Sequence, residues 1–221
     1  MGPSSEGCAL ASVNEDLVTA FTDTREPVYR VYQPERTMVV LGAGGKPEHD
    51  LALGAVQTDR VPVVRRRGGG GTVVLSRGQL VVALVQEVDS PYHNRQYTQD
   101  INAQIAAVLC RLGVRHVVHE GISDLAINKR KILGSSVYRR RRLFFYQASL
   151  LVENDISLFS RYLLQPSRTP EYRAGRLHEE FCTTLRREGY SAILARLQDA
   201  LDEQIRQGLH HPASGHRPTL S

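Results

Sequence analysis

The feature that most constrains the fold of this chain is a series of valine-rich runs in residues 61–85, interrupted by arginines and glycines. Two apolar runs, Val61–Val64 and Leu80–Val85, flank three arginines, four glycines and a third run, Thr72–Leu75. Short valine-rich runs that end at glycine predict β-strands. We therefore expect the loop Gly68–Gly71 to join a strand to a strand.

This glycine loop, Gly68–Gly71, has a composition that suits a bound anion. Its backbone N–H groups can approach a phosphate without obstruction by side chains. The adjacent Arg65, Arg66 and Arg67 can neutralise the charge of the phosphate and grip it through paired hydrogen bonds. The sequence has no GxxxxGK[ST] motif and no GxGxxG that opens a helix, so it matches neither common phosphate loop. On composition alone, a flexible hairpin with solvated arginines remains the alternative.

Composition favours one α/β domain with an acidic partner. The chain has 221 residues, 41% of them hydrophobic, which suits a single domain with a sizeable core. The formal net charge is +5, and much of the excess lies in Arg65–Arg67 and Arg139–Arg142. Such clusters favour a nucleotide, a nucleic acid or an acidic protein. We expect no nucleic acid, because the sequence has no tryptophan, no zinc-finger spacing and no aromatic-rich RNA-binding motif.

The cysteines and the termini predict a cytoplasmic protein. Cys8, Cys110 and Cys182 are odd in number and widely spaced, which argues against a disulfide framework or a zinc site and favours a reducing compartment. No apolar run approaches the roughly 18 residues of a membrane span. The N-terminal residues contain no basic segment followed by an apolar one, so no secretory signal is expected.

Periodicity and end signals divide the chain into helices and strands around the glycine loop. Helices are predicted at Asn14–Phe21 with Asn14 as its cap, His49–Thr58, Asn94–Leu112, Ile156–Leu164 with Asp155 as its cap, and Ser191–Leu209. Strands are predicted at Pro27–Gln33, Thr37–Leu41, Val114–Val118, Asp124–Asn128, Lys131–Leu133 and Leu143–Val152. We expect a disordered segment over residues 1–12, one domain over 13–209 and a polar tail over 210–221.

Three motifs resemble the lipoate–protein ligase family, which shares its fold with biotin ligases and octanoyltransferases. The family loop RR-x-x-GGG-[AT]-V is matched by residues 65–73, RRRGGGGTV. Residues 121–136, GISDLAINKRKILGSS, resemble the family segment that carries an acidic residue and an invariant lysine, here Asp124 and Lys131. A third segment, LLVENDISLFSRYL at residues 150–163, is similar to the family pattern L-L-x-x-D-[LI]-x-x-[LF]-x-x-[YL]-L.

The resemblance implies an α/β (α+β) fold with a mixed, mostly antiparallel sheet and helices packed mainly on one face, similar to class II aminoacyl-tRNA synthetases. It implies ATP-dependent activation of lipoate or octanoate to an acyl-adenylate, with Mg²⁺, and transfer to a carrier lysine. Lys131 and Asp124 would be catalytic, and Asp124 would also bind the metal. The cofactor-binding residues would be Arg65, Arg66, Gly69, Gly70, Gly71, Thr72, Gly78, Gly134 and Ser135. We expect the glycine loop and Lys131 to face one pocket.

The resemblance also implies partners and leaves alternatives. The carrier would be a lipoyl domain of a 2-oxoacid dehydrogenase or a glycine cleavage protein, with a separate accessory protein in place of a C-terminal domain. Octanoyltransferases of this fold use a cysteine, but Cys110 and Cys182 match neither family position, so both are predicted to be structural. A non-catalytic ligand-binding descendant is the second alternative, because Leu75, Gln79 and Gln147 replace usual family residues.

Overall fold

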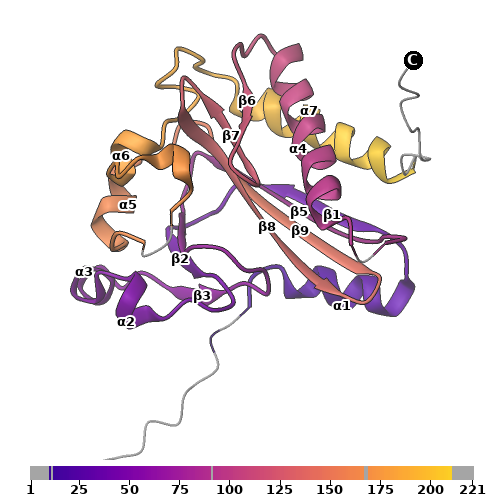
Figure 1. Cartoon of the computed structure of the whole chain (residues 1–221), viewed down its shortest axis with the longest axis horizontal. Coiled ribbons are helices and arrows are strands. Elements are labelled where there is room, and N and C mark those ends of the chain that lie inside the picture. The colour runs from indigo at the N-terminus through magenta and orange to yellow at the C-terminus, as the bar shows by residue number, and fades with distance from the viewer. Residues whose placement is uncertain (1–9, 11, 91, 167–168, 211–221) are drawn as a thin grey trace, which may run out of the picture.

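The valine-rich runs form strands in two separate sheets of the computed structural model, which describes residues 10, 12–90, 92–166 and 169–210 (Figure 1). The larger sheet has six strands in the order β1-β5-β9-β8-β7-β6, and all of its pairings are antiparallel. These strands are β1 (Val28–Tyr32), β5 (Gln79–Glu87), β6 (Val118–Glu120), β7 (Asp124–Ile127), β8 (Arg130–Arg140) and β9 (Leu143–Leu151). The predicted mixed α/β fold with a mostly antiparallel sheet is confirmed.

The smaller sheet holds the strands on either side of the glycine loop. Its order is β3-β2-β4, from β2 (Met38–Leu41), β3 (Val63–Arg65) and β4 (Val73–Leu75). The β2–β3 pair is parallel and the β2–β4 pair is antiparallel. The glycine loop therefore joins two strands, as the sequence predicted, and β5 then leaves for the larger sheet through a turn at Gly78. The single sheet of the prediction is in fact divided in two.

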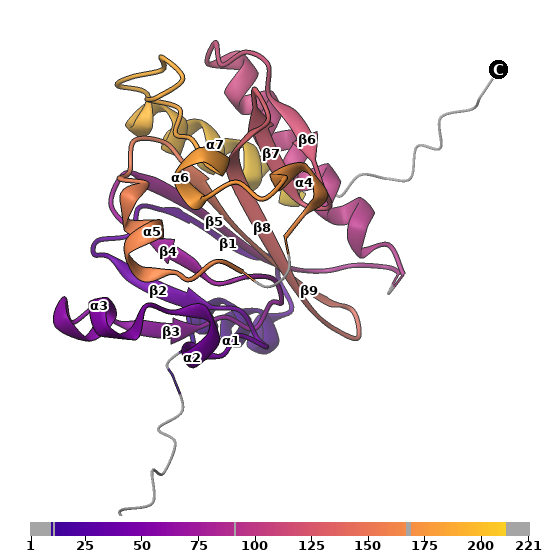
Figure 2. The same ribbon diagram turned by 60° about the vertical axis from the view of Figure 1, so that its left-hand side comes forward.

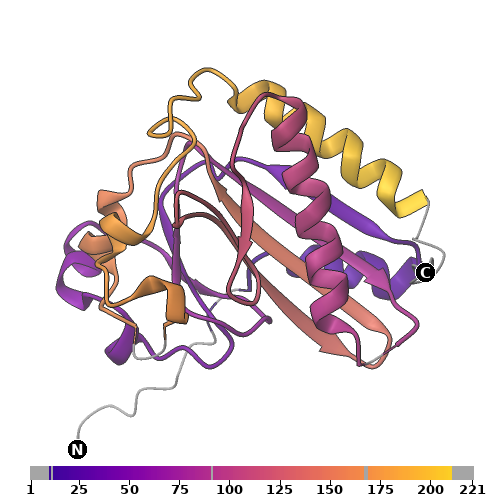
Figure 3. The same cartoon turned by 45° about the horizontal axis from the view of Figure 1, so that its top comes forward.

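Two long helices cover one face of the larger sheet (Figure 3). They are α4 (Asn94–Arg111) and α7 (Leu194–His210), which contribute Ile105, Leu109, Leu197 and Leu201 to a core shared with alternate residues of β5 and β9. Successive strand residues point to opposite faces of a sheet, so Ala83 and Val85 of β5 pack instead against α1 (Glu15–Thr24) on the other face. The prediction that helices lie mainly on one face is confirmed for the long helices.

Short helices surround the smaller sheet (Figure 2). They are α2 (Pro47–Asp50), α3 (Leu53–Thr58), α5 (Ser157–Tyr162), α6 (His178–Phe181) and the 3₁₀ turn η1 (Glu171–Arg173). A second core cluster joins α3, α5 and α6 to β2 and β4, and it contains Val39, Val56, Val74, Phe159 and Phe181. In the part of the chain that the structure describes, no helix has both the length and the apolar composition that a membrane span requires.

Several predicted elements were wrong in detail. The predicted helix His49–Thr58 is two helices, because Leu51 is extended, buried and bridged to Leu163. The predicted strand Val114–Val118 begins only at its last residue, as β6. Asn14 precedes α1 but has a positive φ of 56° and makes no side-chain cap hydrogen bond.

The boundaries of other predicted segments differ less from the structure. The Asp155 carboxylate does accept a hydrogen bond from the Ser157 N–H at the start of α5, at 2.9 Å. The arginine run does not separate two strands, since Arg139 and Arg140 belong to β8. Ser12, in the segment predicted to be disordered, forms a β-bridge with Arg65, whereas residues 1–9, 11 and 211–221 lie outside the described residues.

Candidate active site

A cavity of about 770 Å³ lies where both sheets meet the segment that carries α5, η1 and α6. Its volume is typical of pockets that bind small molecules. Residues of β4, β8 and β9 line it together with Phe159, Arg173 and Phe181. The predicted residues Arg66, Gly70, Gly71, Thr72, Asp124, Lys131, Gly134 and Ser135 all contribute to its wall. The structure therefore brings the glycine loop and Lys131 to one pocket, as predicted.

Lys131 is held in place by an ion pair within this cavity. Its Nζ lies 2.8 Å from Oδ1 of Asp124, and the Lys131 side chain is 27% exposed. The Tyr172 hydroxyl donates a 2.8 Å hydrogen bond to the other carboxylate oxygen, Oδ2. Burial, followed by the Asp124 carboxylate, raises the pKa of Tyr172, so the hydroxyl keeps the proton it donates. Asp124 therefore orients Lys131 and is itself oriented by Tyr172.

Gly134 makes room for the lysine. A Cβ atom at position 134 would lie 2.5 Å from Nζ and 2.6 Å from Cε of Lys131. The lysine side chain thus folds back over the strand residue three positions on, which only glycine permits in this arrangement. Ser135 also lines the cavity, but its hydroxyl donates a 2.9 Å hydrogen bond to the Ser123 carbonyl.

Arg66 shapes the glycine loop from within. The side chain is 7% exposed, and its Nη2 donates to the carbonyls of Gly69 at 2.8 Å and Gly71 at 2.7 Å. In a trans peptide the N–H points opposite to the preceding carbonyl, so the N–H of Gly70 points away from Arg66. Burial lowers the pKa of Arg66 to about 10, which leaves the guanidinium charged at neutral pH. No carboxylate pairs with it among the described residues, so it adds positive charge beside the loop.

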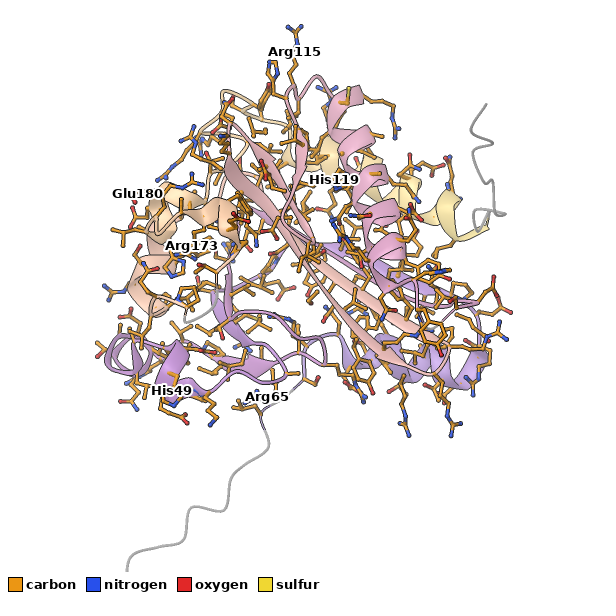
Figure 4. All side chains as sticks on the ribbon, viewed as in Figure 1. His49, Arg65, Arg115, His119, Arg173 and Glu180 are labelled. Atoms are coloured by element: carbon orange, nitrogen blue, oxygen red, sulfur yellow. The ribbon has the colours of Figure 1, made fainter. Side chains whose placement is uncertain are left out.

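The other two arginines of the motif do not line the cavity. Arg65 donates from Nη1 to the carbonyls of Gly42 and Gly45, both at 2.9 Å, and it ends β3 at the lower edge of the molecule in Figure 4. Arg67 pairs with Glu15 and stacks over the Tyr138 ring. Each of these side chains fastens the loop to a different part of the fold. A grip on phosphate by several arginines at once is therefore not available in this arrangement.

Two of the predicted glycines also lie outside the cavity wall. Gly78 has a φ of +84° in the turn before β5, and a Cβ atom there would lie 2.8 Å from the Asn154 nitrogen. Its conformation and close packing explain the glycine without a ligand. Gly69 does not line the cavity, and its carbonyl is the acceptor for Arg66.

The metal site predicted at Asp124 gains no support from the geometry. Both carboxylate oxygens are engaged, one by Lys131 and one by Tyr172. No group of three or more His, Cys, Asp or Glu side chains suited to a metal occurs within the described ranges. Asp50 is the other carboxylate of the cavity wall, and its Oδ2 accepts a 2.6 Å hydrogen bond from the Thr72 hydroxyl. Asp124 is thus better suited to positioning Lys131 than to binding Mg²⁺.

The two described cysteines lie in different environments. Cys110 is exposed on α4, so its thiol is not buried in the apolar core beneath that helix. Cys182 is 7% exposed and lines the cavity, where it forms a β-bridge with Lys131. Burial raises the pKa of the Cys182 thiol to about 11, even though Lys131 and Arg173 lie near enough to lower it. The thiol is therefore neutral near pH 7.

Sequence patterns missed several residues of the cavity wall. Arg173 is 5% exposed, donates to the Gln165 side chain at 2.8 Å and lies on the α6 side of the molecule in Figure 4. His178 is also buried, and its pKa is lowered chiefly by that burial, so its ring is neutral near pH 7. These residues and Tyr172 belong to a segment with no regular periodicity. The sequence did mark one residue of the wall: Gln147, which replaces a usual family residue, also lines the cavity.

The arginine run Arg139–Arg142 lies outside this cavity and begins three residues beyond Ser136, a β8 residue that lines it. Arg140 and Lys131 belong to the same strand, nine residues apart, which corresponds to about 30 Å at the rise of a β-strand. Arg139 donates to Asn94 and to the Ser90 carbonyl, and Arg142 pairs with Glu87. The run is therefore partly neutralised and makes no contribution to the cavity wall.

Comparisons with known proteins agree with this architecture. Residues 10–205 match the family described as the lipoyl protein ligase A/B catalytic domain. An octanoyltransferase of Nitratidesulfovibrio vulgaris is 26% identical over 87% of this chain and 84% of its own length. Lipoate–protein ligase 2 of Staphylococcus aureus is 26% identical over 66% of this chain and 39% of its own length. The chain spans about half the length of the two Mycoplasma relatives it matches, 45% and 44%.

Solved structures show the same fold. The bipartite lipoate protein ligase of Thermoplasma acidophilum, studied with its E2 lipoyl domain, aligns with a TM-score of 0.72 and 19% identity over 91% of this chain and 82% of its own. The family match covers most of the chain. In this chain, the glycine loop and the strand that carries Lys131 line one cavity. This chain belongs to the family of lipoyl protein ligase A/B catalytic domains.

Proposed function

We propose that this chain activates a carboxylic acid with ATP as an acyl-adenylate and transfers the acyl group to a lysine of a lipoyl carrier domain. The observation that carries the proposal is the meeting of Lys131 with the glycine loop in one cavity of about 770 Å³. Lipoate or octanoate is the proposed acid. A crystal structure of a lipoate–protein ligase A with bound ATP has the same fold, with a TM-score of 0.71.

The activation step concentrates negative charge on the α-phosphate and the substrate carboxylate. The glycine-loop N–H groups and the charged Arg66 supply positive potential on one wall of the cavity, and Lys131 supplies it on another. Fixed donors of this kind, aimed at developing charge, typically contribute about 3–4 kcal/mol each to transition-state stabilisation. Lys131 would lie between phosphate and carboxylate, with Asp124 holding the ammonium in position.

ATP fits the cavity wall better than the predicted metal does. The glycine loop offers backbone N–H groups that no side chain covers. Beside it lies Arg66, a buried cation that has no carboxylate partner in the described structure. Mg²⁺ is bound in many such sites chiefly by substrate phosphates and waters, with one or two carboxylates. Because both oxygens of Asp124 are engaged, we assign no step to a metal on that residue.

The partners follow from the same proposal. A lipoyl domain would deliver its lysine to the cavity mouth, and a separate accessory protein would complete the ligase. Two findings support this arrangement: the bipartite Thermoplasma ligase was studied together with its E2 lipoyl domain, and a Thermoplasma lipoate–protein ligase A subunit 1 is similar to this chain. A cytoplasmic location, expected from the cysteine content, belongs to the proposal as well.

Cys182 favours a second candidate function. Its thiol lines the cavity beside Lys131, and the octanoyltransferase relative aligns over most of both chains. In this alternative the Cys182 thiolate would displace a thiol from an acyl thioester, and the carrier lysine would then displace the cysteine. The raised pKa of Cys182 disfavours the thiolate that this route needs.

One experiment separates the two functions. Wild-type protein is assayed for ATP–pyrophosphate exchange with and without lipoate or octanoate, and for modification of a lipoyl domain by mass spectrometry. Adenylation predicts exchange that depends on the acid, and transfer that depends on ATP. Transfer from an octanoyl thioester without ATP would instead establish the acyltransferase. Inactivity in both assays, with and without an accessory protein, would leave only a ligand-binding role.

A further inference from the structure

Gln147 is a buried glutamine that faces the cavity without a hydrogen-bond partner for its amide oxygen. It lies on β9, is 7% exposed and lines the cavity wall. Its Oε1 makes no hydrogen bond within the described residues. A half-turn of the amide exchanges Oε1 and Nε2 without moving the rest of the side chain. The side chain can therefore offer the cavity either an acceptor or two donors.

The neighbours of Gln147 leave space over the sheet. Ser136 lies opposite it on β8 and Ala83 opposite it on β5, while Ser149 lies two positions along the same strand. Side chains two positions apart on a strand share a face of the sheet, so Ser149 lies on the same face as Gln147. The nearest residues to Gln147 on this face, Ser136, Ala83 and Ser149, are all small. In the other direction the next residue on this face is Phe145, which is buried and does not line the cavity. Gln147 therefore marks one end of the cavity floor.

The register also fixes how far Gln147 lies from the lysine. Gly134, which supports the Lys131 ammonium, pairs with Ser149, and Ser136 pairs with Gln147. The two pairs are two residues apart, which corresponds to about 7 Å along the strands. An extended chain advances about 1.2 Å per bond, so this span corresponds to about six bonds. An acid whose carboxylate meets Lys131 thus reaches Gln147 near its sixth bond.

A hydrocarbon chain would leave the Gln147 amide buried and unpaired. Such a site favours a ligand group that completes the hydrogen bond and disfavours an analogue that lacks it. The amide nitrogen of Asn14, which also lines this cavity, has no hydrogen-bond partner in the described structure either. Two unpaired amides in one wall are poorly matched to a purely aliphatic substrate.

We propose that Gln147 determines acyl specificity and that the acid activated here carries a hydrogen-bonding group, such as a hydroxyl, about six bonds from its carboxylate carbon. This inference rests on the proposed acid-activating function. It departs from octanoate, one of the two acids proposed above, by requiring a polar group in the distal half of the acyl chain.

The test compares 6-hydroxyoctanoate with octanoate, because the hydroxyl oxygen of the first lies six bonds from the carboxylate carbon. The ratio of kcat/KM for the two acids is measured by ATP–pyrophosphate exchange in the wild type and in Gln147→Leu. We expect the wild type to prefer the hydroxy acid at least tenfold, about 1.4 kcal/mol. Gln147→Leu should lower that ratio at least tenfold. A ratio of one in the wild type, or an unchanged ratio in the variant, would overturn the inference.

The matched control is Gln79→Leu on β5. Gln79 is also fully buried with an unpaired Oε1, but it does not line the cavity and its Nε2 donates to the Val74 carbonyl. This variant should keep the wild-type ratio even if its stability falls, because a ratio of kcat/KM values does not depend on the amount of folded protein. Loss of the preference in the control as well would contradict a specific role for Gln147.

A binding measurement separates this inference from the proposed function. Calorimetry with the two acyl-sulfamoyl-adenosines, stable analogues of the acyl-adenylates, requires no turnover. A preference for the hydroxylated analogue that Gln147→Leu abolishes would support the inference even if no acid sustained pyrophosphate exchange. Exchange with an unchanged acid ratio would support the function and refute the inference. Failure of both analogues to bind would refute both.

Discussion

Replacing Gly134 by alanine should inactivate the protein without unfolding it. The added Cβ would lie 2.5 Å from the Lys131 ammonium, whereas ordinary contacts begin at 3.4 Å. The ammonium must therefore move by about 0.9 Å or more, away from its 2.8 Å contact with Asp124. Displacements of about 1 Å at a reacting centre can cost about 10²-fold in rate. The displaced atoms are the end of a flexible side chain, so the cost to folding should be small.

The assay is acid-dependent ATP–pyrophosphate exchange, with thermal melting to follow the fold. We expect Gly134→Ala to lose about 10²-fold in exchange rate and to melt near the wild-type temperature. The matched control is Gly54→Ala in α3, where an added Cβ meets nothing within 4 Å. The control should exchange at the wild-type rate. A Gly134→Ala protein that melts normally and exchanges at full rate would refute the argument that this glycine positions the lysine.

The other predictions concern the lysine and the cysteines of the site. Lys131→Ala should reduce adenylation by about 10²-fold or more in the same exchange assay, with normal melting. Lys131→Arg should restore little of this activity, because a planar guanidinium cannot replace a compact ammonium. If Lys131→Ala still lipoylated the carrier at the full rate, the ligase mechanism would be excluded. Cys110→Ala and Cys182→Ala should both retain ATP-dependent transfer, and loss of transfer in folded Cys182→Ala would favour a thioester route. A thiol pKa of about 11 means that little Cys182 thiolate exists at pH 8 and that more forms as the pH rises, so iodoacetamide should label Cys182 much more slowly than exposed Cys110 by peptide mapping. Equal labelling rates at pH 8 would contradict the burial of this thiol.

Local features of the site could be predicted because short stretches of sequence encode them. The glycine loop lies between two strands because valine-rich runs flank it directly. Lys131 and Gly134 are three residues apart on one strand, so their contact depends on local backbone geometry. The helix predicted at Asn94–Leu112 also has a continuous apolar stripe, and α4 matches it within one residue.

The roles of the three arginines could not be predicted, because their partners come from distant parts of the chain. Arg67 pairs with Glu15, 52 residues earlier, and Arg65 bonds to Gly42, 23 residues earlier. From the sequence alone, the three adjacent side chains are seen only as one cluster of positive charge. In the fold only Arg66 lines the cavity, since the others are fastened elsewhere.

The part of the cavity wall that includes Phe181 and Cys182 depends on a contact that no motif contains. The Thr183 N–H donates to the Lys131 carbonyl at 2.9 Å, which attaches the segment after α6 to the lysine strand. Phe181 then buries its ring in the core around the smaller sheet, and Tyr172 packs against that ring at 5.0 Å between centroids. The same packing places the Tyr172 hydroxyl on Asp124. The position of Lys131 in the cavity is therefore maintained from both sides, by a motif within its own strand and by a distant segment whose role only the folded structure reveals.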